Sequence, residues 1–273
     1  MSSSLPRSLL FVPANRADRF DKAVRSGAHQ VILDLEDAVA PGEKEAARGH
    51  VARWEGRTEA IVRVNGADTP YFAGDIEMAR SHGVTSLMLP KAELAALNRL
   101  SELSGENFRV IALIETVESW AELRAIAKHP IVSRLAFGNL DFGVDAGVTE
   151  TARELDPVRL RIVLESRLAG LPPPIDGVTT SWSDEGAFTA EARRAKALGF
   201  AGKLCIHPAQ VKLVNQAFLP TAEEIDWARR VIEAAAAGGG AAVALDGKMI
   251  DAPVTRRAEA VLGSVPGADR ENA

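Results

Sequence analysis

Eight short hydrophobic runs recur along the chain at about thirty-residue intervals, and charged or polar residues stand at the ends of several of them. This spacing is typical of a (β/α)8 barrel, in which eight parallel strands alternate with helices over ~250 residues. The runs are almost continuously apolar, as expected for strands that are buried on both faces. We therefore predict an α/β protein, a TIM barrel, with strands at Leu9–Val12, Val31–Leu35, Ile61–Val64, Leu87–Leu89, Val110–Ile114, Leu135–Phe137, Ile175–Val178 and Lys203–Ile206.

The segments between these runs have helical patterns and are rich in Ala, Leu, Glu, Arg and Lys, which are good helix formers. The seventh strand is the weakest, because three prolines precede it and leave only a few residues for the strand. We predict helices at Glu43–Trp54, Tyr71–His82, Glu93–Leu103, Ser119–His129, Asp156–Ala169, Asp184–Leu198 and Pro208–Ala217.

The remainder of the chain continues the barrel with a helix and an arm. Thr221, with Glu224 three residues later, has the pattern of a capping box and predicts a helix that ends before the glycines at 238–240. We therefore predict a catalytic barrel in residues 1–220 and an additional C-terminal helix and arm in residues 221–273 that contribute to an oligomer and to a neighbouring active site. Within that region we expect an arm at Ala241–Val254, a last helix at Thr255–Leu262 and a frayed end at Pro266–Ala273.

Composition limits the partners of the chain. Its formal net charge of −5 gives no reason to expect nucleic acid or an anionic membrane surface as a partner. No segment approaches the ~20 apolar residues of a membrane span, and the first residues lack the hydrophobic stretch of a secretory signal. The one cysteine, Cys205, excludes an internal disulfide, and its place in an apolar run favours a buried strand residue over a nucleophile. These features lead us to expect a cytoplasmic protein.

Two acids follow neighbouring predicted strands. Glu115 comes at the end of VIALIET, and Asp141 closes RLAFGNLD. Because the C-terminal ends of all barrel strands face one pocket, we expect these carboxylates to meet there. Two adjacent carboxylates repel unless a cation lies between them, and Mg²⁺ is usually held by one or two carboxylates together with water and substrate oxygens. We predict Glu115 and Asp141 as Mg²⁺ ligands; the competing interpretation is two solvated loop carboxylates.

Arg63 lies inside the apolar run AIVRVNG, where a buried guanidinium is costly unless it meets an anion. Its planar fork suits the oxygens of a carboxylate or a thioester enolate, although a structural ion pair with Asp34 or Glu36 is compatible with the same position. Glu36 and Asp37 could orient Arg63, bind water on a metal or act as bases. Asp37 could also simply start the following helix. We predict Arg63, Glu36 and Asp37 as catalytic residues.

Three further positions carry open alternatives. Lys91, after the fourth run, could form a Schiff base or bind an anion at the rim, and His207 could be a base or a hydrogen-bonded structural residue. Asn15 and Arg16 follow the first run, where they could attract phosphate together with the start of a helix, or lie solvated. We include Asn15 and Arg16 among the predicted substrate-binding residues. No glycine-rich phosphate loop stands at a strand–helix turn, so the sequence gives no support for a dinucleotide or P-loop site.

The motifs taken together resemble the citrate-lyase-beta-like branch of the HpcH/HpaI aldolase superfamily, which includes the malyl-CoA and citramalyl-CoA lyases. The resemblance runs from Arg7 to about Val254, and the motifs occur in the order of the family. Any one of them would be a weak signal, whereas the series is specific. The matching segments are RSLLFVPANRADRF, VILDLEDAVAP, IVRVNG, MLPKAE, ALIET, FGNLD, CIHPAQ and GKMIDAPV.

The resemblance implies carbon–carbon bond cleavage or formation beside a CoA thioester, with Mg²⁺ as cofactor. The family's metal carboxylates fall on Glu115 and Asp141, and its substrate-binding arginine falls on Arg63. An aspartate on the C-terminal arm, which in relatives reaches the active site of a neighbouring subunit, often in a trimer, falls on Asp251. Spacing alone would make Asp251 a solvated loop residue, so its role as acid or base rests on the resemblance.

These features predict a Mg²⁺-dependent lyase that cleaves a 3-hydroxy-3-carboxyacyl-CoA of citramalyl, malyl or citryl type to acetyl-CoA and a keto acid. Glu115 and the backbone N–H groups of Gly138, Asn139 and Leu140 are expected to bind the keto acid. Many relatives have an acid where this chain has Leu140, which bears on the choice of acyl acceptor. The alternatives are an aldolase that acts on free 2-keto-3-deoxy acids, and a non-catalytic lyase partner subunit.

Overall fold

The computed structural model describes residues 5–104, 107–149, 153–181, 183–239 and 242–265. The chain forms two compact units, Leu5–Asn215 and a second unit that begins at Gln216. Across the described residues, no helix has both the length and the apolar character needed to cross a bilayer.

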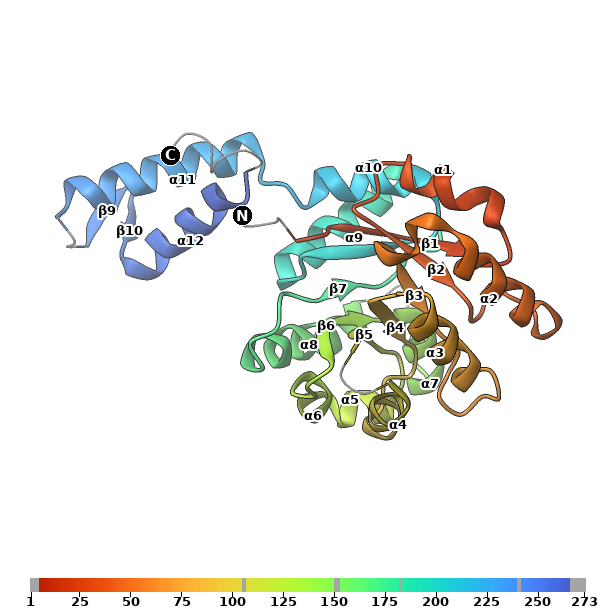
Figure 1. Cartoon of the computed structure of the whole chain (residues 1–273). Coiled ribbons are helices and arrows are strands. Elements are labelled where there is room, and N and C mark those ends of the chain that lie inside the picture. Colours follow the sequence, from red (N-terminus) through yellow and green to blue (C-terminus); the bar gives the residue numbers. More distant parts are fainter. Residues whose placement is uncertain (1–4, 105–106, 150–152, 182, 240–241, 266–273) are drawn as a thin grey trace. The chain divides into compact units, whose positions relative to one another are not determined.

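The first unit is a closed barrel of eight parallel strands in sequence order, so the predicted fold class is confirmed (Figure 1). The closing pair is β1 with β8, where Leu9 lies opposite Leu204. Because every strand runs in the same direction, all of their carboxyl ends open on one face. The strands are β1 Ser8–Pro13, β2 Gln30–Asp34, β3 Ile61–Arg63, β4 Ser86–Leu89, β5 Arg109–Ile114, β6 Val132–Phe137, β7 Ile175–Asp176 and β8 Gly202–Cys205.

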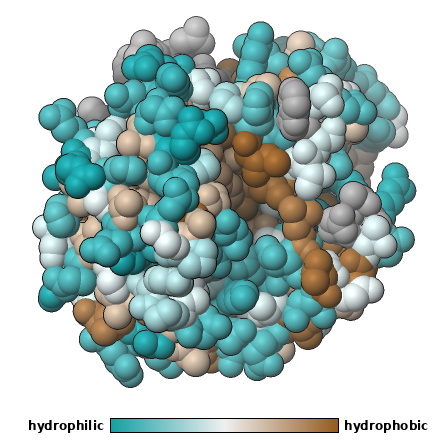
Figure 2. All heavy atoms as spheres, turned by 90° about the vertical axis from the view of Figure 1, so that its right-hand side faces the viewer, coloured by the Kyte–Doolittle hydropathy of each residue, from teal (hydrophilic) through white to brown (hydrophobic). Residues whose placement is uncertain are grey.

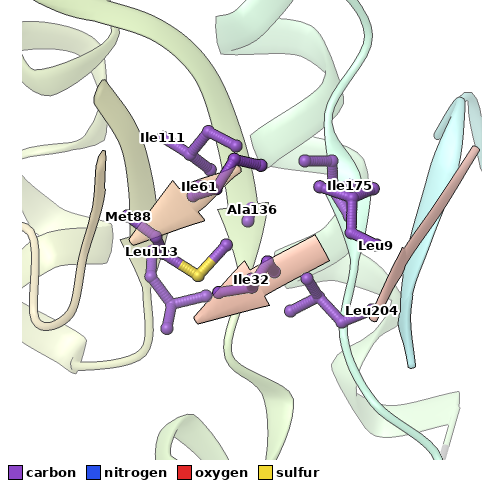
Figure 3. Packing of buried hydrophobic residues seen from close by; sticks show 9 residues of the cluster. All are labelled: Leu9, Ile32, Ile61, Met88, Ile111, Leu113, Ala136, Ile175 and Leu204. Carbon is purple, nitrogen blue, oxygen red and sulfur yellow. The ribbon is translucent and has the colours of Figure 1, made fainter. Parts of the chain in front are cut away.

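Alternate residues of the strands fill the barrel interior. Figure 3 shows nine of these side chains, which come from all eight strands: Leu9, Ile32, Ile61, Met88, Ile111, Leu113, Ala136, Ile175 and Leu204. Phe11 and Val178 pack against this cluster. The barrel is therefore a packed core, and only its mouth is left for chemistry.

Helices surround the strands (Figure 1). The predicted Ser119–His129 helix is two helices, because a capping box at Thr116 starts the first one earlier and the chain breaks at Glu122. The short helix α7 was not predicted, since glycines at 138, 143 and 147 weaken its signal. The helices of this unit are α1 Phe20–Val24, α2 Lys44–Arg53, α3 Phe72–Ser81, α4 Leu94–Ser104, α5 Val117–Ala121, α6 Leu123–Ala127, α7 Asn139–Ala146, α8 Asp156–Leu168 and α9 Glu185–Leu198, followed by α10 Pro208–Ala217 at the end of the unit.

The seventh strand is only two residues long, and a buried charge cluster supports it. Asp176 Oδ2 lies 2.8 Å from Lys203 Nζ of β8, and Asp176 Oδ1 lies 2.9 Å from Arg159 Nε of α8. Lys203 also donates to the carbonyl of Gly177. We call Arg159, Asp176 and Lys203 the Asp176 cluster. It links β7 to β8 and to α8, and it supports a strand whose own pairing is short.

The second unit contains α11 Ala222–Ala237, a hairpin of β9 Val243–Leu245 and β10 Lys248–Ile250, and α12 Ala252–Gly263. Thr221 and Glu224 form the predicted capping box. The hairpin was not predicted, although Asp246 and Gly247 at its turn both have positive φ, the pattern of a two-residue Asp-Gly turn. The expected frayed end at Pro266–Ala273 lies outside the described residues.

Candidate active site

The carboxyl ends of the strands open into a cavity of about 390 Å³, which we call the mouth cavity. Figure 2, which looks at the right-hand side of Figure 1, shows a hollow bordered by hydrophobic surface on one side and by hydrophilic surface on the other. The charged lining residues come from β2, β3, the end of β5 and the start of α7, and they are Asp34, Asp37, Arg63, Glu115 and Asp141. Residues distant in sequence therefore meet in one pocket, as the barrel geometry predicted.

Arg63, the last residue of β3, is held in one orientation by acids of the β2 end. Its Nε and Nη2 each donate to a carboxylate oxygen of Asp34 at 2.7 Å. Nη1 lies 2.9 Å from Glu36 Oε2 and 3.3 Å from Asp37 Oδ2, and the guanidinium lies over the ring of Phe11 at 4.8 Å. Burial alone would lower the pKa of Arg63, but the hydrogen bonds and charges of these acids raise it. The predicted ion pair with Asp34 and Glu36 is confirmed, and the arginine stays charged at the cavity.

Glu115 follows β5 and is only 3% exposed. Its Oε1 accepts a hydrogen bond from the backbone N–H of Lys91 at 2.8 Å. Lys91 is one of two non-glycine residues with positive φ in the described chain, with φ of 43°. Burial first, and then the charge of Glu36, raise the pKa of Glu115 to about 8; the N–H of Lys91 opposes this and the charge of Asp141 adds to it. A bound cation would therefore stabilise the deprotonated form of this buried carboxylate.

Glu36 is a second carboxylate whose pKa is raised, although less than that of Glu115. Burial raises its pKa to about 7, the charge of Arg63 lowers it, and the charges of Asp37 and Asp34 raise it again. The side chain of Asp37 is mostly exposed at the rim. Glu36 therefore titrates near neutral pH, where a carboxylate can exchange a proton with a bound substrate.

Gly138 is required by the path of Glu115. A Cβ at Gly138 would lie 2.5 Å from Glu115 Cβ and 2.6 Å from Glu115 Oε2, closer than two such atoms can approach. Gly138 also begins α7, which places Asp141 in the first turn. The backbone N–H of Gly138 donates to the carbonyl of Ile114, and its expected contact with the keto acid stays a prediction. The N–H groups of Asn139 and Leu140 lie in the first turn of a helix, where no intrahelical acceptor exists.

The donor set fits a magnesium ion. Glu115 and Asp141 are close enough for the charge of one to raise the pKa of the other. Within the described ranges, no three His, Cys, Asp or Glu side chains gather in a metal-binding group. The protein would therefore supply two carboxylates and leave the other positions to water and substrate, as is usual for Mg²⁺.

Glu36 contacts Arg63 but does not itself line the mouth cavity, and the remaining predicted residues also lie outside the lining. Asn15 donates to Glu43, and Arg16 pairs with Asp18 on the surface. The Nδ1 atom of His207 accepts from the backbone N–H of Ala209. The predicted contacts of Asn15 and Arg16 with substrate stay predictions.

Two of the open alternatives concern nucleophiles. Lys91 is exposed and lines a separate cavity with Arg99. Its backbone N–H contacts Glu115, but Lys91 is not among the residues that line the mouth cavity. Cys205 is fully buried, and burial raises the pKa of its thiol to about 12. This supports the interpretation of Cys205 as a strand residue.

Asp251 lies in the second unit and is the N-cap of α12. Its carboxylate accepts a hydrogen bond from the backbone N–H of Val254 at 3.2 Å. This contact gives Asp251 a local structural role that the sequence did not reveal. Its expected role in a neighbouring active site stays a prediction.

The sequence missed the apolar half of the mouth cavity. Leu113 and Leu204 of the barrel core, with Phe11 and Val178 packed against it, form its floor, and Leu140 and Ile206 also line the cavity. Apolar residues at strand ends look like ordinary core in a sequence, so no signal separated them. The sequence indicated only that these apolar runs reach the same strand ends at which the charged residues stand.

Comparison with known proteins agrees with this architecture. The family model described as HpcH/HpaI aldolase/citrate lyase matches residues 7–208. A citrate lyase subunit beta-like protein of Deinococcus radiodurans is 35% identical over 95% of this chain and 97% of its own. A (3S)-malyl-CoA thioesterase of Cereibacter sphaeroides is 33% identical over 90% of this chain and 89% of its own.

Among solved structures, the protein CitE of Mycobacterium tuberculosis in complex with magnesium, acetoacetate and coenzyme A has a TM-score of 0.87 and 34% identity. The match covers 97% of this chain and 99% of that one. These findings confirm the resemblance seen in the motifs, and they make the chain an enzyme of the lyase type: it belongs to the HpcH/HpaI aldolase/citrate lyase family.

Proposed function

We propose that this protein is a Mg²⁺-dependent carbon–carbon lyase that cleaves a 3-hydroxy-3-carboxyacyl-CoA to acetyl-CoA and a 2-keto acid. The observation that carries the proposal is the meeting of Glu115, Asp141 and Arg63 in one cavity at the barrel mouth. Two carboxylates without a cation would be a poor binding site for an anionic substrate. With a divalent cation they offer it two positive partners, the cation and Arg63.

The bound Mg²⁺ would act as a Lewis acid that makes the substrate hydroxyl more acidic and favours the carbonyl of the keto acid. Glu115 and Asp141 are the side chains that would hold it. The magnesium, acetoacetate and coenzyme A present together in the related CitE structure support this assignment.

Proton transfer would begin at Glu36. With a pKa of about 7 this carboxylate can accept the hydroxyl proton of the substrate near neutral pH. The C–O bond then becomes the carbonyl of the keto acid, the bond between the hydroxyl carbon and the thioester α-carbon breaks, and its electron pair passes to a thioester enolate. Arg63, fixed by Asp34, lies where it can offset the enolate charge.

The enolate carbon must then receive a proton to give acetyl-CoA. We assign this step to Asp251 of a neighbouring subunit, in a homo-oligomer for which we favour a trimer. In this scheme residues 1–220 form the catalytic barrel, and residues 221–273 contribute to the oligomer. The backbone N–H groups of Gly138, Asn139 and Leu140 would bind the keto-acid carboxylate, and those of Asn139 and Leu140 have no acceptor within the helix.

A second candidate function is hydrolysis of the thioester. It is favoured by the relative named (3S)-malyl-CoA thioesterase. The same cavity would bind the same substrate, but Glu36 would deprotonate a water molecule that attacks the thioester carbonyl. Release of free coenzyme A distinguishes this reaction from carbon–carbon cleavage, which releases acetyl-CoA.

The test is a steady-state assay that follows acetyl-CoA, keto acid and free coenzyme A by mass spectrometry, with Mg²⁺ and with EDTA. Glu115→Gln should reduce turnover at least ~100-fold, because it removes a charged group at the reacting centre. Glu118→Gln, an exposed position three residues further on, is the matched control and should retain activity. Undiminished Mg²⁺-dependent turnover in Glu115→Gln or Asp141→Asn would contradict the metal assignment.

A further inference from the structure

We infer that the substrate carries a small alkyl group on its hydroxyl-bearing carbon, and that Leu140 is the residue that selects it. This inference rests on the proposed function and narrows its substrate class. The keto acid released would then be pyruvate or a slightly longer 2-oxo acid, in preference to glyoxylate or a dicarboxylic keto acid.

The first argument is the division of the mouth cavity. The charged residues approach from β2, β3, β5 and the start of α7, whereas the floor is apolar. Leu113 and Leu204 belong to the barrel core, and Phe11 and Val178 pack on it. A substrate whose hydroxyl and carboxylate face the acids and their cation therefore directs its third substituent toward hydrocarbon.

The second argument is charge. Among the described residues that line the cavity, Arg63 is the one cation, and it already pairs with Asp34, Glu36 and Asp37. A substrate with a second carboxylate would place that group among these acids or against the apolar floor. A buried carboxylate without a partner is strongly disfavoured. A substrate with hydrogen in place of the alkyl group would make no contact with the apolar residues of the floor.

The third argument is the position of Leu140. It lies in the first turn of α7 beside Asp141, and it lines both the mouth cavity and a second cavity of about 120 Å³. The second cavity is lined by Arg159, which is only 9% exposed. Arg159 Nη1 has no hydrogen-bond partner among the described residues, and Asp156 is 3.8 Å from it. Leu140, together with Asn139 and Val178, lines both cavities, and it is therefore part of the wall between the mouth cavity and the cavity that contains this guanidinium.

The experiment is run in the condensation direction with acetyl-CoA, Mg²⁺ and one of four keto acids: glyoxylate, pyruvate, 2-oxobutyrate or oxaloacetate. Mass spectrometry separates the thioester products by mass, so pyruvate formed by decarboxylation of oxaloacetate is recognised. We expect kcat/KM for pyruvate to exceed that for oxaloacetate and for glyoxylate by ~10-fold or more, the discrimination that a methyl group gives in an apolar pocket.

Variants on α7 test the assigned residue. Leu140→Ala should lower the pyruvate-to-oxaloacetate ratio of kcat/KM by ~10-fold, because it removes hydrocarbon and shortens the wall in front of Arg159. Val144→Ala, at a position on the same helix that is 84% exposed, should leave the ratio unchanged. Circular dichroism confirms that each variant is folded, and the wild-type ratios test the inference without any variant.

Oxaloacetate or glyoxylate used as well as pyruvate by the wild type would overturn the inference, and so would a ratio unmoved by Leu140→Ala in a folded variant. Either result leaves lyase chemistry intact. A wild-type enzyme that forms no thioester product with any of the four keto acids, in the presence of Mg²⁺, would instead overturn the proposed function itself.

Discussion

Asp176→Asn should destabilise the barrel more than any surface charge change, because it leaves two buried cations without their anion. Asp176 binds Lys203 at 2.8 Å and Arg159 at 2.9 Å, and the side chains of Asp176 and Lys203 are 3% and 1% exposed. Removal of one partner from a buried ion pair costs ~3–5 kcal/mol in free energy of unfolding. In a unit of this size the midpoint of thermal unfolding should fall by ~6–20 °C.

The pH dependence has a defined sign. Burial would raise the pKa of Asp176, but the charges of Lys203 and Arg159 outweigh it and lower the pKa below its ordinary value. A carboxylate with a lowered pKa stabilises the fold above the pKa of the unfolded chain and loses that contribution as the pH falls through the folded value. The difference between wild type and Asp176→Asn should be constant from pH 8 to 5 and shrink below about pH 4.

The measurement is urea unfolding of wild type and variant without Mg²⁺, followed by far-UV circular dichroism at several pH values. Glu77→Gln is the control, since its pair with Arg80 is 60% and 57% exposed. An exposed pair is screened by solvent and adds little to stability, so this variant should unfold close to wild type. If Asp176→Asn unfolds within ~1 kcal/mol of wild type, the Asp176 cluster does not stabilise β7.

Three further predictions concern the site and the core. Mg²⁺ should raise the midpoint of thermal unfolding of the wild type but not that of Glu115→Gln. The affinity for Mg²⁺ should increase from pH 6 to pH 8, because Glu36 and Glu115 have pKa values of about 7 and 8 and a carboxylate binds metal when it is deprotonated. Calorimetry that finds no pH dependence of this affinity would contradict the prediction. Gly138→Ala should weaken Mg²⁺ binding at least ~10-fold, because its Cβ would occupy space that Glu115 holds; an unchanged affinity would mean that Glu115 can move aside. Cys205, buried and with a pKa of about 12, should not react with a thiol reagent at pH 8 until denaturant is added; rapid labelling of the native protein would refute its placement.

Much of the fold could be predicted because the eight strands are apolar on both faces and evenly spaced. The elements that were missed have weak local signals. The helix α7 is eight residues long and contains Gly143, and the hairpin of the second unit depends on one Asp-Gly turn. The Asp176 cluster was also invisible, since Lys203 and Asp176 lie in short runs whose burial depends on the helix packed outside them.

The charged part of the site was more predictable than the apolar part. Glu115, Arg63 and Asp141 stand out because charged residues beside apolar strand ends need a partner. Val178 and Leu204 carry no such signal, although they shape the same cavity. The hydrogen bond from the N–H of Gly138 to the carbonyl of Ile114 was not predicted, because a sequence does not show which backbone donors are already used within the fold.

Glu36 connects the stability of the protein to its chemistry. The raised pKa of about 7, against an ordinary 4.5, means that the unfolded chain gives up this proton more readily than the folded protein does. Stability therefore falls as the pH rises from about 4.5 to 7, and the shift corresponds to at most ~3.4 kcal/mol at ~1.4 kcal/mol per pH unit. The attraction of Arg63 is already contained in this pKa, so Glu36→Gln should gain stability relative to wild type between pH 5 and pH 8, by no more than this amount.

The same substitution should abolish most lyase turnover if Glu36 accepts the hydroxyl proton. A variant that is more stable and less active is the expected result where a functional site is itself a source of instability. Urea unfolding at pH 5 and pH 8, together with turnover at pH 8, measures both effects in one variant. If the stability of the variant relative to wild type were the same at pH 5 and at pH 8, the pKa of Glu36 would not be raised in the folded protein, and Glu36 would not be the group that accepts the hydroxyl proton near neutral pH.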